Sequence, residues 1–346
     1  MSARLRAAVV GCGDISAVHL DALLADPDVH TVGVCDVDPD RRSAAAQRAG
    51  CAGFADVAAM LTAVAPDVVH VCTPHHLHAE QAAECLAGGI SVLLEKPVAR
   101  TVAEAERLAI AAGNSSAVLG VCFQNRYNAT SRALRDRLDE GSLGRVLGGR
   151  ASVTWSRDAA YYAHRSWRGR WASAGGGVLM NQAIHTLDLL QWFLGPVSDV
   201  RGTAATLALA GVIEVEDTAA IQLHHRTAAG DVVPSVFHAT NGHVENAPIT
   251  VEIRTELATL RLDTELTVTH VDGRVETVAE AATAAGERSY WGASHALLIR
   301  DFHQHVRAGK DFWIDVPAAL ETLRIIDAVY ANSPNLDRHA LQGQHA

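Results

Sequence analysis

The chain has 346 residues, 49% hydrophobic and 20% charged, values typical of a folded protein with two domains and not of a disordered or fibrous chain. Its net charge of −10 is spread out and no lysine- and arginine-rich run occurs, which argues against a nucleic-acid partner. No apolar run approaches the roughly 20 residues of a bilayer span and no secretion signal is recognised, so we expect no membrane contact and a cytoplasmic location.

The first third of the sequence alternates short apolar runs with alanine-rich helical segments. The apolar runs lack polar alternation, as expected for parallel strands covered on both faces. The predicted strands are Leu5–Val10, Thr31–Cys35, a weaker one near Phe54, Val68–Cys72, Ser91–Leu94 and Ala117–Phe123. The predicted helices are Ile15–Leu24, Arg41–Ala49, Val57–Val64, His78–Ala87 and Val102–Ala111. This alternation indicates a doubly wound α/β domain, the Rossmann arrangement, over residues 1–124.

From residue 125 onward the pattern changes to short strands rich in β-branched residues. The predicted strands are Val146–Trp155, Val197–Leu207, Asp217–His224, Val232–Ala239, Thr250–Glu256, Thr259–Leu262 and Leu266–Val271. Helices are expected over Ala129–Leu138, Leu179–Phe193, Ser294–Arg307 and Pro317–Tyr330. We therefore expect residues 125–346 to form an α+β domain with a mostly antiparallel sheet. This domain would bind substrate and join subunits, and an open sheet face with an apolar outer surface favours a homodimer or homotetramer.

The turn between the first strand and the first helix has the pattern of a dinucleotide-binding loop. Glycines in such a loop permit a tight turn and a close approach of backbone amides to a pyrophosphate. The motif is incomplete, because Ser16 stands where the third glycine of G-x-G-x-x-G would be. The expected cofactor contacts in the loop are Gly11, Cys12, Gly13, Asp14, Ile15 and Ser16.

An acidic residue follows at the expected distance. Asp36 ends the second predicted strand, 23 positions after Gly13, about the separation at which a carboxylate meets the adenosine ribose hydroxyls. A carboxylate there repels a 2′-phosphate, so NAD is predicted rather than NADP, although Arg41 and Arg42 soften that preference. The alternative is an ordinary aspartate that initiates a turn.

Three further motifs make the chain resemble the Gfo/Idh/MocA family of glucose–fructose oxidoreductase and inositol dehydrogenase. They are Cys72–His78, Glu95-Lys96-Pro97, and Gly175–Gly177 followed by His185–Asp188. The resemblance covers nearly the whole chain. It implies an NAD(P)-dependent oxidoreductase that moves hydride between the nicotinamide and a secondary hydroxyl or ketone of a sugar, glycoside, sugar derivative or cyclitol. The cofactor contacts that it implies are Thr73, Pro74, His75, His78, Glu95, Lys96, Pro97 and Asn125.

The resemblance also implies a catalytic set. Lys96 leaves the predicted sheet at the edge where doubly wound folds bind ligands, and it would polarise the reacting oxygen. His185 would be the acid/base, since an imidazole with a pKa near 6.5 can take a hydroxyl proton near neutral pH. In one continuous helix Asn181, His185 and Asp188 would share a face. Asn181 stands where inositol dehydrogenase has an aspartate, and an amide orients a hydroxyl without ionising. A surface lysine and a structural histidine capped by Asp188 are the alternatives.

Substrate contacts are expected from an aromatic and basic segment before the glycine run, although these side chains could instead pack in the core or at an interface. The candidate substrate contacts are Arg126, Tyr162, Trp167, Arg168, Asn181 and His185. Further candidates near the C-terminal helices are Tyr290, Trp291 and His295.

Two other functions stay open at the level of sequence. One is NAD-assisted glycoside cleavage through a 3-keto intermediate, and the other is a non-catalytic NAD-binding sensor or co-repressor. No metal is expected, because the six cysteines form no C-x-x-C pair and no ligand cluster has zinc-site spacing along the sequence.

Overall fold

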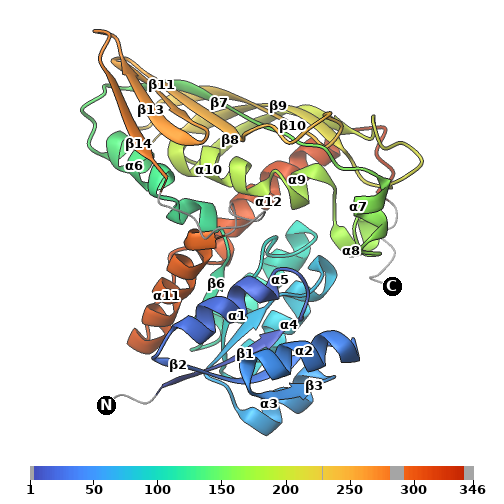
Figure 1. The fold of residues 1–346 in the computed structure, drawn as a ribbon. Coiled ribbons are helices and arrows are strands. Elements are labelled where there is room, and N and C mark those ends of the chain that lie inside the picture. Colours follow the sequence, from blue (N-terminus) through green and yellow to red (C-terminus); the bar gives the residue numbers. More distant parts are fainter. Residues whose placement is uncertain (1–3, 228, 281–291, 339–346) are drawn as a thin grey trace. The chain divides into compact units, whose positions relative to one another are not determined.

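The structure is a computed structural model that describes residues 4–227, 229–280 and 292–338 (Figure 1). The chain divides into two compact units, one of residues 1–124 and 283–320, the other of residues 125–282 and 321–346. The division after residue 124 lies where the sequence pattern changes. Residues 283–320, which the sequence analysis placed in the second domain, group with the first unit.

The first unit contains a six-stranded parallel sheet in the order β3-β2-β1-β4-β5-β6. The strands β4 and β5 are buried along their whole length, as strands covered on both faces must be. The predicted doubly wound α/β fold is confirmed. The strands are β1 (Leu5–Val10), β2 (Val29–Cys35), β3 (Ala52–Phe54), β4 (Val68–Val71), β5 (Ser91–Leu94) and β6 (Leu119–Val121).

Helices connect these strands, and several begin at a capping side chain. Asp56 accepts a hydrogen bond from the Ala59 amide, and the Thr101 hydroxyl accepts one from Glu104. A helix from late in the chain, α11, packs beside α1 and reaches β5 (Figure 1). The helices of this unit are α1 (Ser16–Ala25), α2 (Pro39–Ala49), α3 (Val57–Val64), α4 (His75–Ala87), α5 (Val102–Gly113) and α11 (Gly292–Ala308).

The second unit contains an eight-stranded sheet in the order β14-β13-β12-β11-β7-β10-β9-β8. All neighbouring strands are antiparallel except β7 and β10, which confirms the predicted mostly antiparallel sheet. Burial alternates along β10, so one face of the sheet is packed and the other is exposed. The strands are β7 (Val146–Thr154), β8 (Val197–Ala205), β9 (Thr218–Arg226), β10 (Val232–Thr240), β11 (Thr250–Thr255), β12 (Ala258–Leu262), β13 (Glu265–His270) and β14 (Val275–Ala279).

Short helices of the second unit pack on the sheet, with α10 against β7 and α9 against β9 and β10 (Figure 1). The helix predicted over Leu179–Phe193 is wrong in one respect, because it is broken into α9 and α10 at Gln182 and Ala183. The helices are α6 (Ala129–Asp139), α7 (Ala159–Ala163), α8 (Trp171–Ala174), α9 (Val178–Asn181) and α10 (Ile184–Leu194). A 3-10 turn (Gln124–Tyr127) and α12 (Val316–Ala331) each run from one unit into the other.

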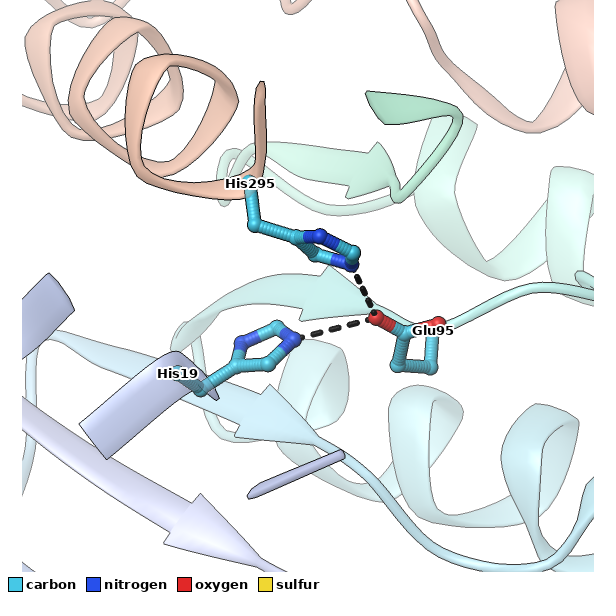
Figure 2. Close-up of side chains that lie close together, drawn as sticks. All are labelled: His19, Glu95 and His295. Atoms are coloured by element: carbon cyan, nitrogen blue, oxygen red, sulfur yellow. Dashed lines mark hydrogen bonds and ion pairs between the residues drawn. The ribbon is translucent and has the colours of Figure 1, made fainter. Parts of the chain in front are cut away.

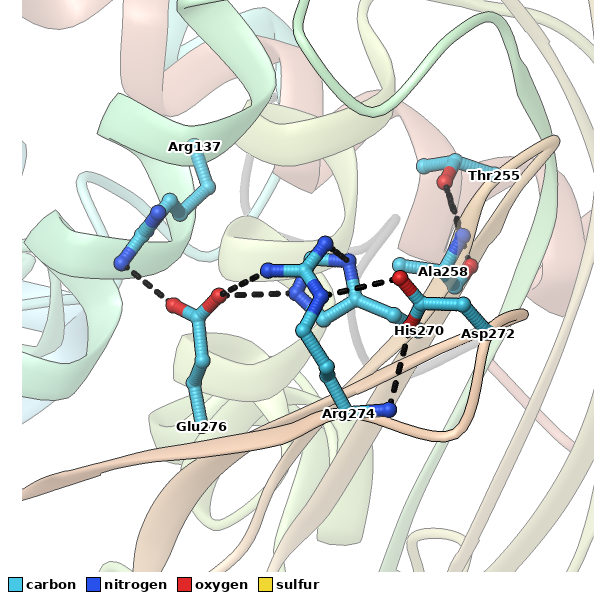
Figure 3. Close-up of polar contacts among 7 residues, drawn as sticks. All are labelled: Arg137, Thr255, Ala258, His270, Asp272, Arg274 and Glu276. Atoms are coloured by element: carbon cyan, nitrogen blue, oxygen red, sulfur yellow. Dashed lines mark hydrogen bonds and ion pairs between the residues drawn. The ribbon is translucent and has the colours of Figure 1, made fainter.

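A polar cluster holds the β13–β14 hairpin to α6 (Figure 3). Arg137 of α6 donates to the Glu276 carboxylate at 2.8 Å, and His270 lies 2.8 Å from the other oxygen of that carboxylate. Arg274 pairs with Asp272 in the turn between the strands. The cluster gives the strand β14, which the sequence analysis missed, a fixed place beside the helix.

Two further findings concern membrane-spanning helices and the state of the cysteines. Among the residues that the structure describes, no helix combines the length and the apolar character that a bilayer span requires. All six cysteines are free thiols.

Candidate active site

The predicted dinucleotide loop joins β1 to α1 and packs against the end of β4. Gly11 has φ of +87°, and a Cβ built on it would lie 2.7 Å from the carbonyl carbon and oxygen of Cys72. A Cβ on Gly13 would meet nothing within 4 Å. Ser16, in the place of the third glycine, is buried and donates its hydroxyl to the Gly13 carbonyl at 2.6 Å. The loop is therefore tight on one side and open over Gly13, which fits a bound pyrophosphate.

Asp36 lies at the end of β2 with its carboxylate turned toward this loop. One carboxylate oxygen accepts a hydrogen bond from the Cys12 amide at 2.7 Å, and the other accepts one from Asp38 at 2.8 Å. Arg42 donates to the Asp36 backbone carbonyl at 2.7 Å. The negative charge thus stands beside the loop, where it fits a ribose with free hydroxyls.

His78 joins the turn at Thr73 and Pro74 to the turn at Lys96 and Pro97. Its two ring nitrogens lie 2.8 Å from the Thr73 carbonyl oxygen and 2.7 Å from the Pro97 carbonyl oxygen. A neutral imidazole has one N–H and can donate to only one of them. Burial lowers the pKa of His78, against the opposing effect of the two carbonyls. The ring of His75 is buried 5.6 Å from that of His78, so both predicted cofactor contacts pack within the first unit.

Lys96 follows the buried strand β5 and is half-buried, at the carboxyl edge of the sheet. The peptide bond between Lys96 and Pro97 is cis. The preceding Glu95 is buried, and one of its carboxylate oxygens lies 3.0 Å from His19 and 3.5 Å from His295 (Figure 2). Burial alone would raise the pKa of Glu95, but the two histidines hold it well below its usual range.

Asn181 and His185 are the half-exposed positions of an otherwise buried stretch. Every other residue of the stretch 178–190, all of which the structure describes, is buried. The amide of Asn181 donates to the Tyr161 hydroxyl at 3.3 Å. Because Asn181 ends α9 and His185 lies in α10, the predicted helical spacing between them does not hold.

Arg126 was predicted to contact the substrate, but the structure gives it a structural partner. Its guanidinium donates two hydrogen bonds to the Asp188 carboxylate, at 2.8 and 2.7 Å, and both side chains are buried. Thr322 donates to the same carboxylate at 3.3 Å. Asp188 is therefore paired with Arg126, a contact that the sequence analysis did not predict.

The aromatic and basic segment forms a network that the sequence analysis located only in part. The predicted Tyr162 is buried, and its hydroxyl accepts a hydrogen bond from Asn241 at 2.9 Å. Tyr161 is half-exposed and accepts one from Gln182 at 3.0 Å. Nothing in the sequence favoured Tyr161 over the adjacent Tyr162 as a substrate contact. The short helix α7 determines that Tyr162 is buried and Tyr161 is half-exposed.

Two guanidinium groups flank the ring of Tyr161. The guanidinium carbon of Arg157 lies 5.1 Å from the ring centre and that of Arg168 lies 4.4 Å from it. Arg168 also lies 5.7 Å from the ring centre of Trp167. Arg157, which the sequence analysis missed, thus joins the predicted Trp167 and Arg168 around one aromatic ring.

A buried carboxyl, that of Glu216, supports the glycine run Gly175–Gly177, which precedes Asn181 in the sequence. Glu216 accepts hydrogen bonds from the Gly177 and Leu179 amides and from the Tyr330 hydroxyl, at 2.8, 2.9 and 2.8 Å. Burial nevertheless raises the pKa of Glu216 to about 7. Nothing in the local sequence marks this glutamate, because its partners come from three separate segments.

The predicted site residues divide between the units. The dinucleotide loop, Asp36 and Lys96 belong to the first, whereas Asn181 and His185 belong to the second. Asn125 lies in the 3-10 turn at the boundary. Tyr290 and Trp291 lie outside the described residues, and His295 is buried beside Glu95.

Comparison with known proteins gives matches along most of the chain. Residues 5–123 match an oxidoreductase family described by its NAD-binding Rossmann fold, and residues 131–261 match the GFO/IDH/MocA C-terminal domain. The solved WlbA dehydrogenase from Bordetella pertussis, in complex with NADH and UDP-GlcNAcA, is 30% identical, with a TM-score of 0.81 over 95% of this chain and 96% of that one. D-apiose dehydrogenase from Paraburkholderia graminis is 27% identical over 95% of this chain and 88% of its own length. D-glucoside 3-dehydrogenase from Escherichia coli is 33% identical over 56% of this chain and 55% of its own length.

Proposed function

Because this chain belongs to the Gfo/Idh/MocA oxidoreductase family, with its NAD-binding Rossmann fold, we propose that it transfers hydride between NAD(H) and a secondary hydroxyl or ketone of a sugar derivative. The observation that carries this proposal is the partial exposure of Asn181 and His185 in an otherwise buried stretch. A structural histidine in that stretch would be expected to be buried like its neighbours. A partly exposed imidazole is suited to exchange a proton with a substrate.

The cofactor role follows from the loop and its acidic neighbour. NAD, when bound, supplies the nicotinamide carbon that accepts or gives the hydride. The backbone amides after Gly11 and around Gly13 would hold the pyrophosphate, and Asp36 would accept hydrogen bonds from the adenosine ribose hydroxyls. The same carboxylate would repel a 2′-phosphate, which favours NAD over NADP.

Three side chains would handle the substrate oxygen. His185 takes the hydroxyl proton during oxidation and returns it during reduction. Lys96 stabilises the negative charge that develops on that oxygen, and Asn181 orients the hydroxyl without ionising. His78 acts through the two turns that it joins, so we assign it a positioning role.

The substrate class is suggested by the surroundings of Tyr161. Two guanidinium groups and an aromatic face favour a sugar derivative that carries negative charge, because arginine binds carboxylates and phosphates through paired donors. The similar WlbA dehydrogenase was crystallised with UDP-GlcNAcA, a ligand of that kind. We therefore place acidic and nucleotide-linked sugars first among candidate substrates.

A second candidate function is NAD-assisted cleavage of a glycoside after oxidation at position 3. The observation that favours it is the likeness to D-glucoside 3-dehydrogenase. This reaction would release an aglycone without net formation of NADH, which distinguishes it from simple dehydrogenation.

The exposed face of the second unit's sheet suits a second copy of the chain. Val232 and Val236 on β10 are each 54% exposed, and Arg150 of the neighbouring strand β7 lies opposite Val236. We propose a homodimer or homotetramer that uses this face. Light scattering of Val236→Asp, which would place a charge in the contact, should show a smaller particle than the wild type does.

The catalytic proposal is tested by screening acidic sugars, nucleotide sugars, glycosides and cyclitols for NADH formation. With the best substrate, His185→Ala and Lys96→Ala should each lower kcat/KM roughly 10²–10⁴-fold while NAD still binds. His30→Ala, which changes an exposed histidine on β2, should leave the rate unchanged. If His185→Ala retains full turnover, His185 is not the acid/base. If NAD binds but no substrate class gives turnover or cleavage, the sensor or co-repressor function replaces the enzymatic one.

A further inference from the structure

Three metal-binding side chains meet in the first unit although the sequence separates them widely. His19 lies in α1, Glu95 directly follows β5, and His295 lies in the first turn of α11. All three are buried, with exposed fractions of 0%, 5% and 0%. Figure 2 shows both imidazole rings turned toward the same carboxylate oxygen of Glu95. Two imidazoles and a carboxylate form a known zinc ligand set.

We propose that His19, Glu95 and His295 bind one zinc ion, which fastens α11 to the edge of the Rossmann sheet. Tetrahedral zinc with bonds of about 2.0–2.1 Å requires its ligand atoms to lie about 3.3 Å apart. The carboxylate oxygen of Glu95 lies 3.0 Å from His19 Nε2 and 3.5 Å from His295 Nε2. The ligand atoms of all three residues lie within 4.8 Å of one another, so small side-chain shifts would fill three of the four tetrahedral positions, and a water would take the fourth.

Neighbouring hydrogen bonds hold two of these ligands in the required orientation. The second oxygen of Glu95 accepts a hydrogen bond from the Lys96 amide at 3.2 Å, which leaves the first oxygen for the ion. Nδ1 of His19 lies 2.8 Å from Nδ1 of His70, and Nε2 of His70 lies 3.0 Å from Nε2 of His303. Zinc-bound histidines commonly donate their other N–H to such a partner.

The chain of histidines also has a single consistent arrangement of protons when zinc is bound. With zinc on Nε2, His19 carries its proton on Nδ1 and donates it to Nδ1 of His70. His70 then carries its proton on Nε2 and donates it to Nε2 of His303. Each of these rings is neutral, so Glu95 carries the only negative charge in the cluster and offsets one of the two positive charges of the ion.

The consequence of the ion would be structural. It would join α1, the end of β5 and α11. Residue 295 would thereby be bound to the rest of the first unit, although residues 125–282 of the second unit separate it from residues 1–124 in the sequence. It would also fix the end of β5, from which Lys96 continues. Because the ion binds the folded chain and not the unfolded one, its binding should raise the melting temperature.

The test uses the full chain without a histidine tag, stripped with a chelator and then titrated with Zn²⁺ or Co²⁺. We expect one tightly bound Zn²⁺ per chain by elemental analysis after gel filtration, a higher Tm, and intense visible bands of tetrahedral Co²⁺. His295→Ala and the nearly isosteric Glu95→Gln should abolish the bands. His70→Phe, which removes the partner of His19, should weaken Zn²⁺ binding roughly 10–100-fold.

His305→Ala is the matched control, because His305 lies on the same helix outside the cluster and is half-buried. It should bind Zn²⁺ as the wild type does. The proposal is overturned if the stripped wild type takes up no stoichiometric Zn²⁺, which would leave a hydrogen-bonded trio only. It is also overturned if Glu95→Gln or His295→Ala keeps the Co²⁺ bands. Should one of these two variants fail to fold, the other variant and His70→Phe still decide the outcome.

Discussion

Gly11 and Gly13 belong to the same loop but differ in what surrounds them. A side chain on Gly11 would strike the backbone of Cys72 and would occupy the left-handed region of φ, whereas a side chain on Gly13 would point into open space. Gly11→Ala should therefore destabilise the fold by about 2–4 kcal/mol, from strain and overpacking together. Gly13→Ala should keep the wild-type Tm and weaken NAD binding at least about tenfold, because its methyl group occupies the space of the phosphates.

Thermal unfolding and fluorescence titration with NADH separate these two effects. Each variant serves as the control for the other, since both add one methyl group to the same loop. Equal losses of stability in the two variants would contradict the packing difference, and unchanged NAD binding by Gly13→Ala would contradict the assignment of the open space to the cofactor.

Glu216 makes stability depend on pH in a defined direction. Burial raises its pKa from 4.5 to about 7, so the protonated form stabilises the fold fully below about pH 4.5. That contribution is lost as the pH rises toward 7, and it amounts to about 3 kcal/mol. Urea unfolding at pH 5 and pH 8 should show the wild type losing about that much relative to Glu216→Gln, which cannot ionise.

The comparison needs a variant that changes an equivalent but solvated charge. Glu245 is exposed, so Glu245→Gln should keep the pH dependence of the wild type. If Glu216→Gln follows the wild-type curve between pH 5 and pH 8, then the three hydrogen bonds to the carboxylate outweigh its burial and Glu216 is ionised throughout.

The 3-10 turn and α10 are held together by one buried ion pair. Arg126 and Asp188 are 5% and 1% exposed at their side chains and form a two-point contact. Arg126→Met should leave the Asp188 charge buried without its partner and cost about 3–5 kcal/mol of stability. The double variant Arg126→Met/Asp188→Leu should lose less stability than the two single variants lose together, because no buried charge remains. Additive losses in chemical denaturation would rule out the coupling.

Elements with a strong local signal were predictable from the sequence. The strands Leu5–Val10 and Ser91–Leu94 have the predicted bounds, because a short and mostly apolar run needs cover on both faces and fits few other structures. The strand β14 was missed because it is short and has no fully buried face, since its residues alternate between exposed and half-buried positions. The break at Gln182 and Ala183 was missed because the apolar pattern continues across it, and the interruption comes from packing around Glu216 and Asn241.

In the candidate site, too, residues with a strong local sequence signal were predictable and residues paired only by the fold were not. Lys96 and Asp36 could be located because each follows a strand whose direction places its carboxyl end at the ligand edge. The partners of Glu95 could not be located, since His19 and His295 come near the two ends of the chain and no local pattern pairs them. The ion pair of Arg126 could not be predicted for a similar reason, because Asp188 meets it only in the folded chain.

At the scale of the whole molecule, residues 283–320 belong to the first unit and therefore determine whether residues 1–124 can fold by themselves. The rings of Phe302 and Phe312 are buried against the backbone of Gly120 in β6. The amide of Val121 donates to the Ile314 carbonyl at 2.8 Å. Burial of each ring contributes about 1.5–3 kcal/mol, a large part of the 5–15 kcal/mol typical of a domain. The first 124 residues should therefore be too unstable to fold without this late segment.

We expect a fragment of residues 1–124 to show no cooperative unfolding transition by circular dichroism and no NAD binding. Joining it through a flexible glycine–serine linker to residues 283–320 should restore both, because β6 regains its cover. Within the full chain, Phe302→Ala should cost about 3–5 kcal/mol, whereas Trp313→Ala, which changes a side chain that is 40% exposed, should cost much less. A fragment of residues 1–124 that unfolds cooperatively at the midpoint of the linked fragment would show that the late segment adds nothing to the stability of the Rossmann unit.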